Sequence, residues 1–131
     1  MLIDTSGFFA LYSEKDKNHL RAKGLYQQSR LRITTNYILA EYVALALVRG
    51  LPRRDVLEFS EEILYDETVE IVWVDAPRHT KAVELLGQRP DKTYSLCDTV
   101  SFCLMRERRI NEALTTDKHF VQEGFERLLD P

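Results

Sequence analysis

Apolar residues recur along this chain with two different periods, and the period changes repeatedly from one segment to the next. Short apolar runs are typical of buried strands, whereas apolar positions three or four residues apart are typical of helices. The predicted strands cover residues 1–3, 31–34, 69–74, 113–115 and 125–129, and the predicted helices lie around residues 5–12, 19–26, 36–49, 53–64, 77–86 and 95–108. Strands separated by helical segments predict a parallel sheet with helices on both faces.

Capping residues set the expected ends of several helices. Thr5 or Ser6 is expected to cap the first helix, and Asn36 is expected to cap the third. Gly50 suits the end of the third helix, because glycine readily adopts the left-handed conformation found there. Pro77 suits the first turn of the helix that follows VEIVWV, the clearest strand in the chain.

The third helix carries a charged residue in an otherwise apolar run. Residues 37–48 read YILAEYVALALV, and Glu41 is the only one of them that is neither apolar nor aromatic. A buried carboxylate without a partner is costly, because the low-dielectric interior disfavours its charged form. The position of Glu41 therefore predicts either a partner for its charge or a helix face that is open to solvent.

Length and composition predict one globular domain that covers residues 1–131. Hydrophobic residues make up 44% of the chain and charged residues 30%, which argues against a disordered or membrane-spanning chain. No apolar run approaches the roughly 20 residues that a bilayer span needs. The first residues, MLIDTSGFF, have no basic segment and no small-residue cleavage site, so we expect no signal peptide and a cytoplasmic location.

The formal net charge of −3 provides no overall attraction to nucleic acid. A nucleic-acid partner would therefore depend on local basic groups, and the candidates are Arg49, Arg53, Arg54, Lys92 and Lys118. A further basic cluster also suits the negative end of a helix dipole, and it consists of Arg106, Arg108 and Arg109.

Four acidic residues stand where the predicted sheet could bring them together. Asp4 follows the first strand, and Asp117 follows the strand at residues 113–115. If these two strands are neighbours, both carboxylates rise from the edge of the sheet at which ligands bind in parallel α/β folds. Asp98 lies in the first turn of its helix and Glu41 lies early in the third helix, so both could join them.

Converging carboxylates raise one another's pKa unless a cation neutralises them. Oxygen ligands without histidine or cysteine favour Mg²⁺ or Mn²⁺ over Zn²⁺, and such ions activate water against a phosphodiester. His19, His79 and His119 show no metal-ligand spacing, and we expect them at the surface or in packing. The pattern therefore predicts hydrolytic cleavage of a phosphodiester bond.

Each acidic residue also has a structural explanation, and the sequence leaves both explanations open. Asp4 could end a strand in a turn, and Asp117 could cap a short final helix. Ser95 and Asp98 spell S-x-x-D, the pattern of a capping box. Only the joint placement of the four acidic residues favours the functional interpretation.

The same residues lie in segments that resemble the motifs of PIN-domain proteins, specifically the free-standing VapC-type toxins of VapBC toxin–antitoxin pairs. These segments are MLIDTSGFFAL with Asp4, TTNYILAEYVAL with Glu41, SLCDTVSFCLM with Asp98 and ALTTDKHFVQEGF with Asp117. Their order and spacing resemble those of the family, and they span the chain almost end to end. One departure is Cys97, because the family commonly has threonine before the aspartate of its third motif.

The resemblance implies an α/β/α sandwich on a five-stranded parallel sheet of order 3-2-1-4-5, in which the first and fourth strands are adjacent. It implies a catalytic pocket that holds Mg²⁺ or Mn²⁺ on the carboxylates of Asp4, Glu41, Asp98 and Asp117. Ser6 and Thr116 match hydroxyl positions that support this pocket. Asp91, in the loop PDKTYS, is a further acidic residue that we expect to be merely solvated.

The implied activity is endoribonuclease cleavage of single-stranded or looped RNA by the toxin of a type II toxin–antitoxin pair. The implied partners are a VapB-type antitoxin, whose tail covers the acidic site, and a second copy of the chain in a homodimer, with no membrane involved. The side chains that could line a partner groove, or else belong to the core, are Phe8, Phe9, Tyr12, Tyr42 and Leu45. Within the family, the alternatives are a housekeeping RNA-processing nuclease and a non-catalytic module that binds RNA or a partner.

Two classes of protein outside the family fit less well. A phosphotransfer hydrolase with an aspartyl nucleophile needs a second Asp two residues after the first, where this chain has Ser6. A receiver-type signalling domain needs an acidic pair after the first strand, and Asp4 has no acidic neighbour. Intact carboxylates at all four motif positions favour a catalytic PIN domain over a degenerate one.

Overall fold

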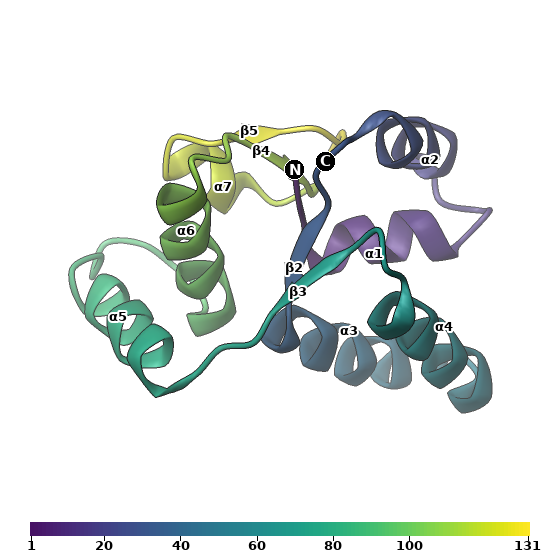
Figure 1. Ribbon diagram of the computed structural model, residues 1–131, viewed down its shortest axis with the longest axis horizontal. Coiled ribbons are helices and arrows are strands. Elements are labelled where there is room, and N and C mark those ends of the chain that lie inside the picture. The colour runs from purple at the N-terminus through teal and green to yellow at the C-terminus, as the bar shows by residue number, and fades with distance from the viewer.

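The computed structural model describes residues 1–131 and contains a five-stranded sheet with helices on both sides (Figure 1). The strands are β1 (Leu2–Ile3), β2 (Ile33–Thr35), β3 (Glu70–Val72), β4 (Glu112–Leu114) and β5 (Glu126–Arg127). The helices are α1 (Thr5–Tyr12), α2 (His19–Gln28), α3 (Asn36–Val48), α4 (Arg53–Tyr65), α5 (Ala76–Gly87), α6 (Leu96–Arg108) and α7 (Lys118–Gln122). Every predicted strand and helix is present. None of the helices has the length and apolar character that crossing a membrane requires.

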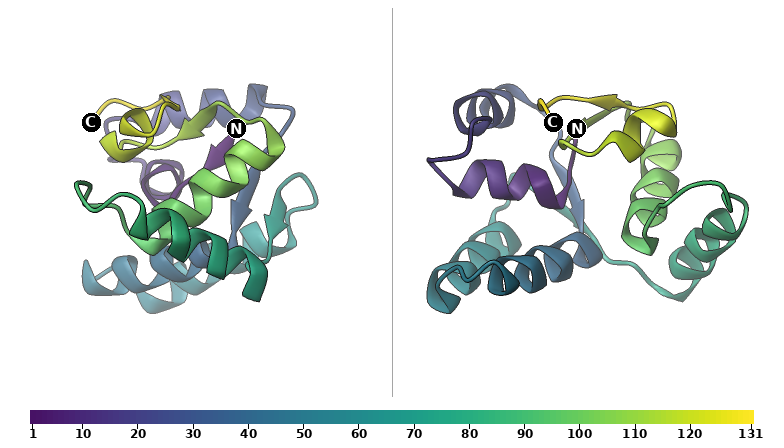
Figure 2. Two further views of the ribbon diagram at one scale, coloured as in Figure 1. Left: turned by 90° about the vertical axis from the view of Figure 1, so that its left-hand side faces the viewer. Right: turned by 180° about the vertical axis from the view of Figure 1, so that it is seen from behind.

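All strand pairs are parallel, in the order β3-β2-β1-β4-β5, which confirms the sheet that the resemblance implies. The central strand β1 pairs Leu2 with Ile33 of β2 on one side and with Ala113 of β4 on the other. Helices α1 to α4 gather on one side of the sheet and α5 to α7 on the other (Figures 1 and 2). The strand order reverses between β1 and β4, so the carboxyl ends of these two strands open onto one crevice.

Gly7 allows α1 to lie directly against β4. A Cβ atom at this position would overlap with the backbone carbonyl oxygen of Leu114. The backbone N–H of Asp4 donates to the same oxygen at 3.3 Å, so the end of β1 is also held there. This close approach places residues 4–6 beside residues 115–117, where the polar side chains gather.

Aromatic packing between α1 and α3 forms part of the core. Phe8 and Phe9 of α1 contact Tyr42 of α3, with ring centroids 6.1 and 5.1 Å apart. All three side chains are buried, so they belong to the core, and Phe9 also lines the cavity described below. Tyr12 and Leu45 are partly exposed.

The cap of α3 differs from the prediction. Thr35 caps this helix, because its hydroxyl accepts a hydrogen bond of 3.1 Å from the N–H of Ile38. The side chain of Asn36 instead accepts the N–H of Val74 at 2.7 Å. This contact explains why β3 ends at Val72 and not at Val74 as predicted, since the Val74 N–H bonds to a side chain and not to β2.

The cap of α1 also differs from the prediction. Asp4 occupies the N-cap position in place of Thr5 or Ser6, and its carboxylate makes no capping hydrogen bond. The Asp4 carboxylate is therefore available for contacts across the sheet edge. Gly50 has the left-handed conformation predicted for the end of α3, with φ of 78°.

Candidate active site

The four acidic residues singled out in the sequence line one cavity of about 350 Å³. Asp4 directly follows β1, Glu41 belongs to α3, Asp98 belongs to α6, and Asp117 directly precedes α7. The strand order explains this convergence, because β1 pairs with β4 and their carboxyl ends meet at one sheet edge. The other lining residues are Thr5, Ser6, Phe9, Asp16, Leu45, Arg49 and Thr116.

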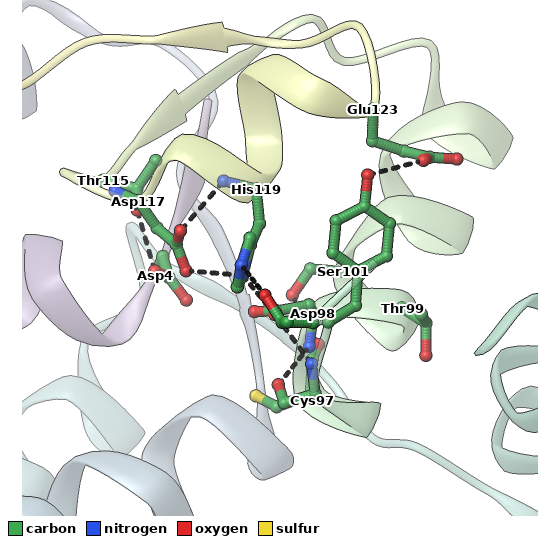
Figure 3. A network of polar contacts seen from close by, with 12 residues as sticks. Asp4, Cys97, Asp98, Thr99, Ser101, Thr115, Asp117, His119 and Glu123 are labelled. Atoms are coloured by element: carbon green, nitrogen blue, oxygen red, sulfur yellow. Dashed lines mark hydrogen bonds and ion pairs between the residues drawn. The ribbon is translucent and has the colours of Figure 1, made fainter. Parts of the chain in front are cut away.

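Asp4 is the most buried of the four carboxylates, with 7% of its surface exposed. The hydroxyl of Thr115 donates a hydrogen bond of 2.8 Å to Asp4 Oδ2 (Figure 3). Burial raises the pKa of Asp4 to about 7, although the hydrogen bond from Thr115 acts in the opposite direction. The negative charges of Asp98 and Glu41 raise this pKa further. A cation in the cavity would have the reverse effect, because positive charge favours the ionised carboxylate.

Glu41 faces the cavity from the apolar helix α3. The hydroxyl of Thr5 donates a hydrogen bond of 3.0 Å to Glu41 Oε2. Burial raises the pKa of the Cys97 thiol, and a hydrogen bond with Glu41 and the charge of Glu41 raise it further. The carboxylate in the run YILAEYVALALV therefore has a hydrogen-bond partner and faces the cavity that the other three carboxylates line.

Asp98 and Asp117 combine a capping role with a place in the cavity. Ser95 and Asp98 form a reciprocal capping box at the start of α6, in which Asp98 Oδ2 accepts the Ser95 N–H at 2.9 Å. Asp117 caps α7, because its Oδ1 accepts the N–H of His119 at 2.9 Å. Burial raises the pKa of Asp98, and the charge of Asp117 adds to this effect. The structural explanations for both residues are correct, and they do not exclude the functional one.

His119 joins these two carboxylates, so the expectation of a surface or packing residue is wrong for this histidine. Its Nδ1 lies 3.0 Å from Asp98 Oδ2 and 3.3 Å from Asp117 Oδ2 (Figure 3). The other two histidines are packing residues, as expected. His19 is buried and its ring contacts the carbonyl oxygen of Ala10, and His79 packs on Tyr37. No i,i+4 spacing marks His119, since its partner Asp98 lies 21 residues away in the sequence.

The hydroxyl groups around the cavity form a short chain of contacts. Ser6 Oγ accepts the N–H of Thr116 at 2.9 Å and lies 3.1 Å from Thr115 Oγ1, which in turn donates to Asp4. Thr115 is a residue that sequence reasoning missed in favour of its neighbour Thr116. Asp16, a fifth carboxylate in the cavity lining, was missed because it lies in a polar stretch without a pattern.

Among the basic candidates, only Arg49 lines the cavity. Its guanidinium carbon lies 4.2 Å from the ring centroid of Phe9, and it forms none of the salt bridges in the structure. Arg106 and Arg108 are engaged in ion pairs with other carboxylates. Asp91 is exposed, pairs with Lys92 at 3.3 Å and does not line the cavity, as expected.

The donor atoms in this cavity fit a divalent cation. Asp98, Asp117 and His119 each offer one ligand atom, and these atoms lie within 4.8 Å of one another. Asp4 and Glu41 add carboxylate oxygens in the same cavity. A set dominated by hard oxygen donors suits Mg²⁺ or Mn²⁺, whereas thiolate-rich sets select softer metals.

The family model described as the PIN domain matches residues 1–125. The chain therefore belongs to the PIN-domain family, which removes the phosphotransfer hydrolase and the receiver domain from consideration. Its fold and its acidic sheet edge are those that the resemblance of the four motifs implies.

Within this family the chain is similar to VapC proteins. The 23S rRNA-specific endonuclease VapC20 of Mycobacterium tuberculosis is 30% identical over 126 residues, which cover 95% of both chains. A VapC ribonuclease of Archaeoglobus fulgidus is 29% identical, with 91% of this chain and 78% of that protein covered. The crystal structure of M. tuberculosis VapC20, described as a Sarcin-Ricin loop cleaving toxin, matches with a TM-score of 0.87 and 28% identity. That match covers 99% of this chain and 98% of the other.

Proposed function

We propose that this chain is a divalent-metal-dependent endoribonuclease of the VapC type. The observation that carries the proposal is the convergence of Asp4, Glu41, Asp98 and Asp117 on one cavity. Burial and mutual repulsion disfavour four ionised carboxylates there, and a bound cation would remove that penalty. Relatives that match this chain over most of its length are named as an endonuclease and a ribonuclease, which supports nuclease chemistry at this site.

The residues of the cavity would have different roles in the reaction. The four carboxylates would hold Mg²⁺ or Mn²⁺, which when bound supplies an activated water and stabilises the leaving oxygen of a phosphodiester. Thr115 and Thr5 orient Asp4 and Glu41 through hydrogen bonds, so these carboxylates need little reorganisation. Arg49 at the rim offsets the repulsion between the carboxylates and the phosphates of the substrate.

RNA with a single-stranded or looped segment is the proposed substrate. Proteins recognise RNA sequences mainly in loops and unpaired segments, whose bases and backbone are accessible. One relative, VapC20 of M. tuberculosis, is named for 23S rRNA, and its crystal structure is described as that of a Sarcin-Ricin loop cleaving toxin. A hairpin with that loop is therefore the first defined substrate to test.

We further propose that the chain acts as the toxin of a type II toxin–antitoxin pair. In this proposal residues 1–131 form a single PIN domain, which works in the cytoplasm as a homodimer and is bound by a VapB-type antitoxin. The support is the similarity to VapC proteins over almost the whole chain.

The proposed function is tested with purified, antitoxin-free protein and RNA, with Mg²⁺ or Mn²⁺ present or removed by a chelator. We expect cleavage only with metal, and loss of cleavage in Asp4→Asn and Asp98→Asn. Asp91→Asn is the matched control, because Asp91 is an exposed aspartate outside the cavity. If Asp4→Asn and Asp98→Asn cleave as fast as the parent, the assigned site is wrong. If the parent does not cleave RNA with either metal, a non-catalytic binding module replaces the proposal.

A further inference from the structure

We infer that His119 is a positioning residue of the acidic cavity. Its ring Nδ1–H donates to Asp98 and its backbone N–H donates to Asp117, so one residue contacts both carboxylates. Its other ring nitrogen contacts Thr93 in the loop of residues 88–95. The inference rests on the proposed function, because it concerns how the same site keeps its metal-binding arrangement.

Two carboxylates face one nitrogen of the His119 ring. Nδ1 lies 3.0 Å from Asp98 Oδ2 and 3.3 Å from Asp117 Oδ2. An ionised carboxylate can only accept hydrogen bonds, so Nδ1 must carry a hydrogen to satisfy this geometry. The backbone N–H of His119 also donates to Asp117 Oδ1, so a single residue contacts both oxygens of Asp117.

The loop before α6 fixes the orientation of the His119 ring. Thr93 Oγ1 lies 3.0 Å from Nε2, and this nitrogen accepts the hydroxyl hydrogen when Nδ1 carries its own. The ring of Tyr94 packs edge-on against the imidazole, with centroids 5.2 Å apart. The imidazole therefore cannot rotate away from the carboxylates without losing two contacts to the loop.

Glu123 holds the same loop in place from the other side. Its carboxylate accepts hydrogen bonds from Arg89 at 2.8 Å and from the hydroxyl of Tyr94 at 3.0 Å. Only 4% of the Glu123 side chain is exposed, whereas its partner Arg89 is 32% exposed. The loop thus connects the carboxylate of Glu123 to the ring of His119 and, through it, to the acidic cavity.

This arrangement favours a role for His119 as a hydrogen-bond donor to the carboxylates over a role as a metal ligand. The hydrogen on Nδ1 points toward Asp98 Oδ2, so the Nδ1 lone pair is not available to a metal ion. Asp98 Oδ1 accepts no hydrogen bond from the protein and could therefore bind the metal. The donated hydrogen reduces the repulsion between Asp98 and Asp117 and orients the remaining oxygens toward the cavity. Hydrogen-bond partners of metal-binding carboxylates typically change metal affinity by about 10- to 100-fold when removed.

The first test is Mn²⁺ affinity, measured by isothermal titration calorimetry. His119→Phe keeps the aromatic packing on Tyr94 but removes the ring N–H, and we expect about 10- to 100-fold weaker binding. His119→Asn offers an amide N–H near the position of Nδ1, so it should restore most of the affinity. His79→Phe is the matched control, because His79 packs on Tyr37 outside the cavity, and its affinity should equal that of the parent.

The second test addresses the loop and the mode of contact. Thr93→Val should weaken Mn²⁺ binding less than His119→Phe, and the double variant should be no weaker than His119→Phe alone, because both changes act through one ring. Electron spin echo spectra of the Mn²⁺-loaded parent should show no nitrogen coupling from a directly bound imidazole. Thermal unfolding of the metal-free variants identifies any variant that fails to fold.

Three results would overturn the inference: unchanged Mn²⁺ affinity in His119→Phe, no recovery in His119→Asn, or a nitrogen coupling in the parent that His119→Phe removes. The variant Asp98→Asn distinguishes failure of the inference about His119 from failure of the proposed function. If the parent binds Mn²⁺ and Asp98→Asn does not, the metal site stands whatever His119 does. If the parent binds no Mn²⁺, both the proposed function and the inference about His119 fail.

Discussion

Asp4 and Thr115 connect the ends of the central strand β1 and its neighbour β4, because the Thr115 hydroxyl donates a hydrogen bond of 2.8 Å to the Asp4 carboxylate. Asp4 directly follows β1 and Thr115 directly follows β4. The same hydroxyl accepts the backbone N–H of Asp117 at 3.0 Å. One hydroxyl group therefore fixes the relative position of two of the carboxylates in the cavity.

We expect Thr115→Val to lower the rate of RNA cleavage by about 10-fold or more, because valine keeps the shape of the side chain and removes the hydroxyl. Thr115→Ser should restore most of the rate. Initial rates measured across a range of Mn²⁺ concentrations separate weaker metal binding from slower turnover. Thr80→Val on α5 is the control, because Thr80 is exposed and outside the cavity. A parental rate in Thr115→Val would show that this hydroxyl does not orient Asp4.

The stability of the metal-free protein should depend on pH through Asp4. Burial raises the pKa of Asp4 from 3.8 to about 7 in the folded protein. The folded chain therefore holds a proton that the unfolded chain releases, so the contribution of Asp4 to stability is fully present below about 3.8 and is lost as the pH rises to about 7. The raised pKa of Asp98, also caused first by burial, acts in the same direction.

Urea unfolding with a chelator, at about pH 5 and about pH 8, measures this dependence. Asp4→Asn should lose less stability than the parent between the two values, because asparagine does not titrate. Asp91→Asn should behave as the parent. An equal loss in the parent and in Asp4→Asn would contradict the assigned environment of Asp4.

Tyr42 carries the one buried side-chain polar atom without a hydrogen-bond partner in the structure, its hydroxyl oxygen. Burial raises the pKa of Tyr42 to about 12. We expect Tyr42→Phe to increase the free energy of unfolding by about 1 kcal/mol, because it removes an unsatisfied polar group. Tyr26→Phe is the contrasting variant, since it loses a hydrogen bond of 2.8 Å to Asp66 and should destabilise the protein. Lower stability of Tyr42→Phe in urea unfolding would show that its hydroxyl has a partner.

Glu123 should stabilise the protein in a pH-dependent way. Burial alone would raise the pKa of Glu123, but hydrogen bonds from Arg89, Arg106 and Tyr94 outweigh it and lower the pKa from 4.5 to about 2. The contribution of Glu123 to the stability of the folded protein is therefore present above about pH 4.5 and is lost as the pH falls toward 2. Glu123→Gln should unfold at a lower temperature than the parent at neutral pH, and the difference should shrink below pH 4.5. Glu126→Gln, an exposed change on β5, should show no such difference. A constant difference at every pH would contradict the ionised pairing of Glu123.

Much of the fold could be predicted because it depends on local patterns. The hydrophobic period identifies the five strands and helices α1 to α6, whereas α7 is indicated only by the possible capping role of Asp117. The S-x-x-D pattern identifies the capping box of Ser95 and Asp98. The cap of α3 could not be predicted, because the choice between Thr35 and Asn36 depends on the N–H of Val74, which follows β3 and is distant in the sequence.

The candidate site shows the same division between local and distant contacts. Its carboxylates could be identified, because each lies at the end of a strand or early in a helix. The contacts of His119 could not, since they depend on Asp98 and Thr93, which are 21 and 26 residues away. Thr115 was overlooked because two adjacent threonines are equivalent in the sequence, and only the packing of α1 on β4 selects the one that reaches Asp4.

In our proposal, four carboxylates from separate segments of the chain, which line one cavity, form one metal site. Calorimetric titration of Mn²⁺ into the parent and into single neutralising variants tests it most directly, and the variants are Asp4→Asn, Glu41→Gln, Asp98→Asn and Asp117→Asn. We expect the parent and the Asp91→Asn control to bind Mn²⁺ equally, and each of the four variants to bind it more weakly. Parental affinity in all four variants, or no binding by the parent, would contradict the claim.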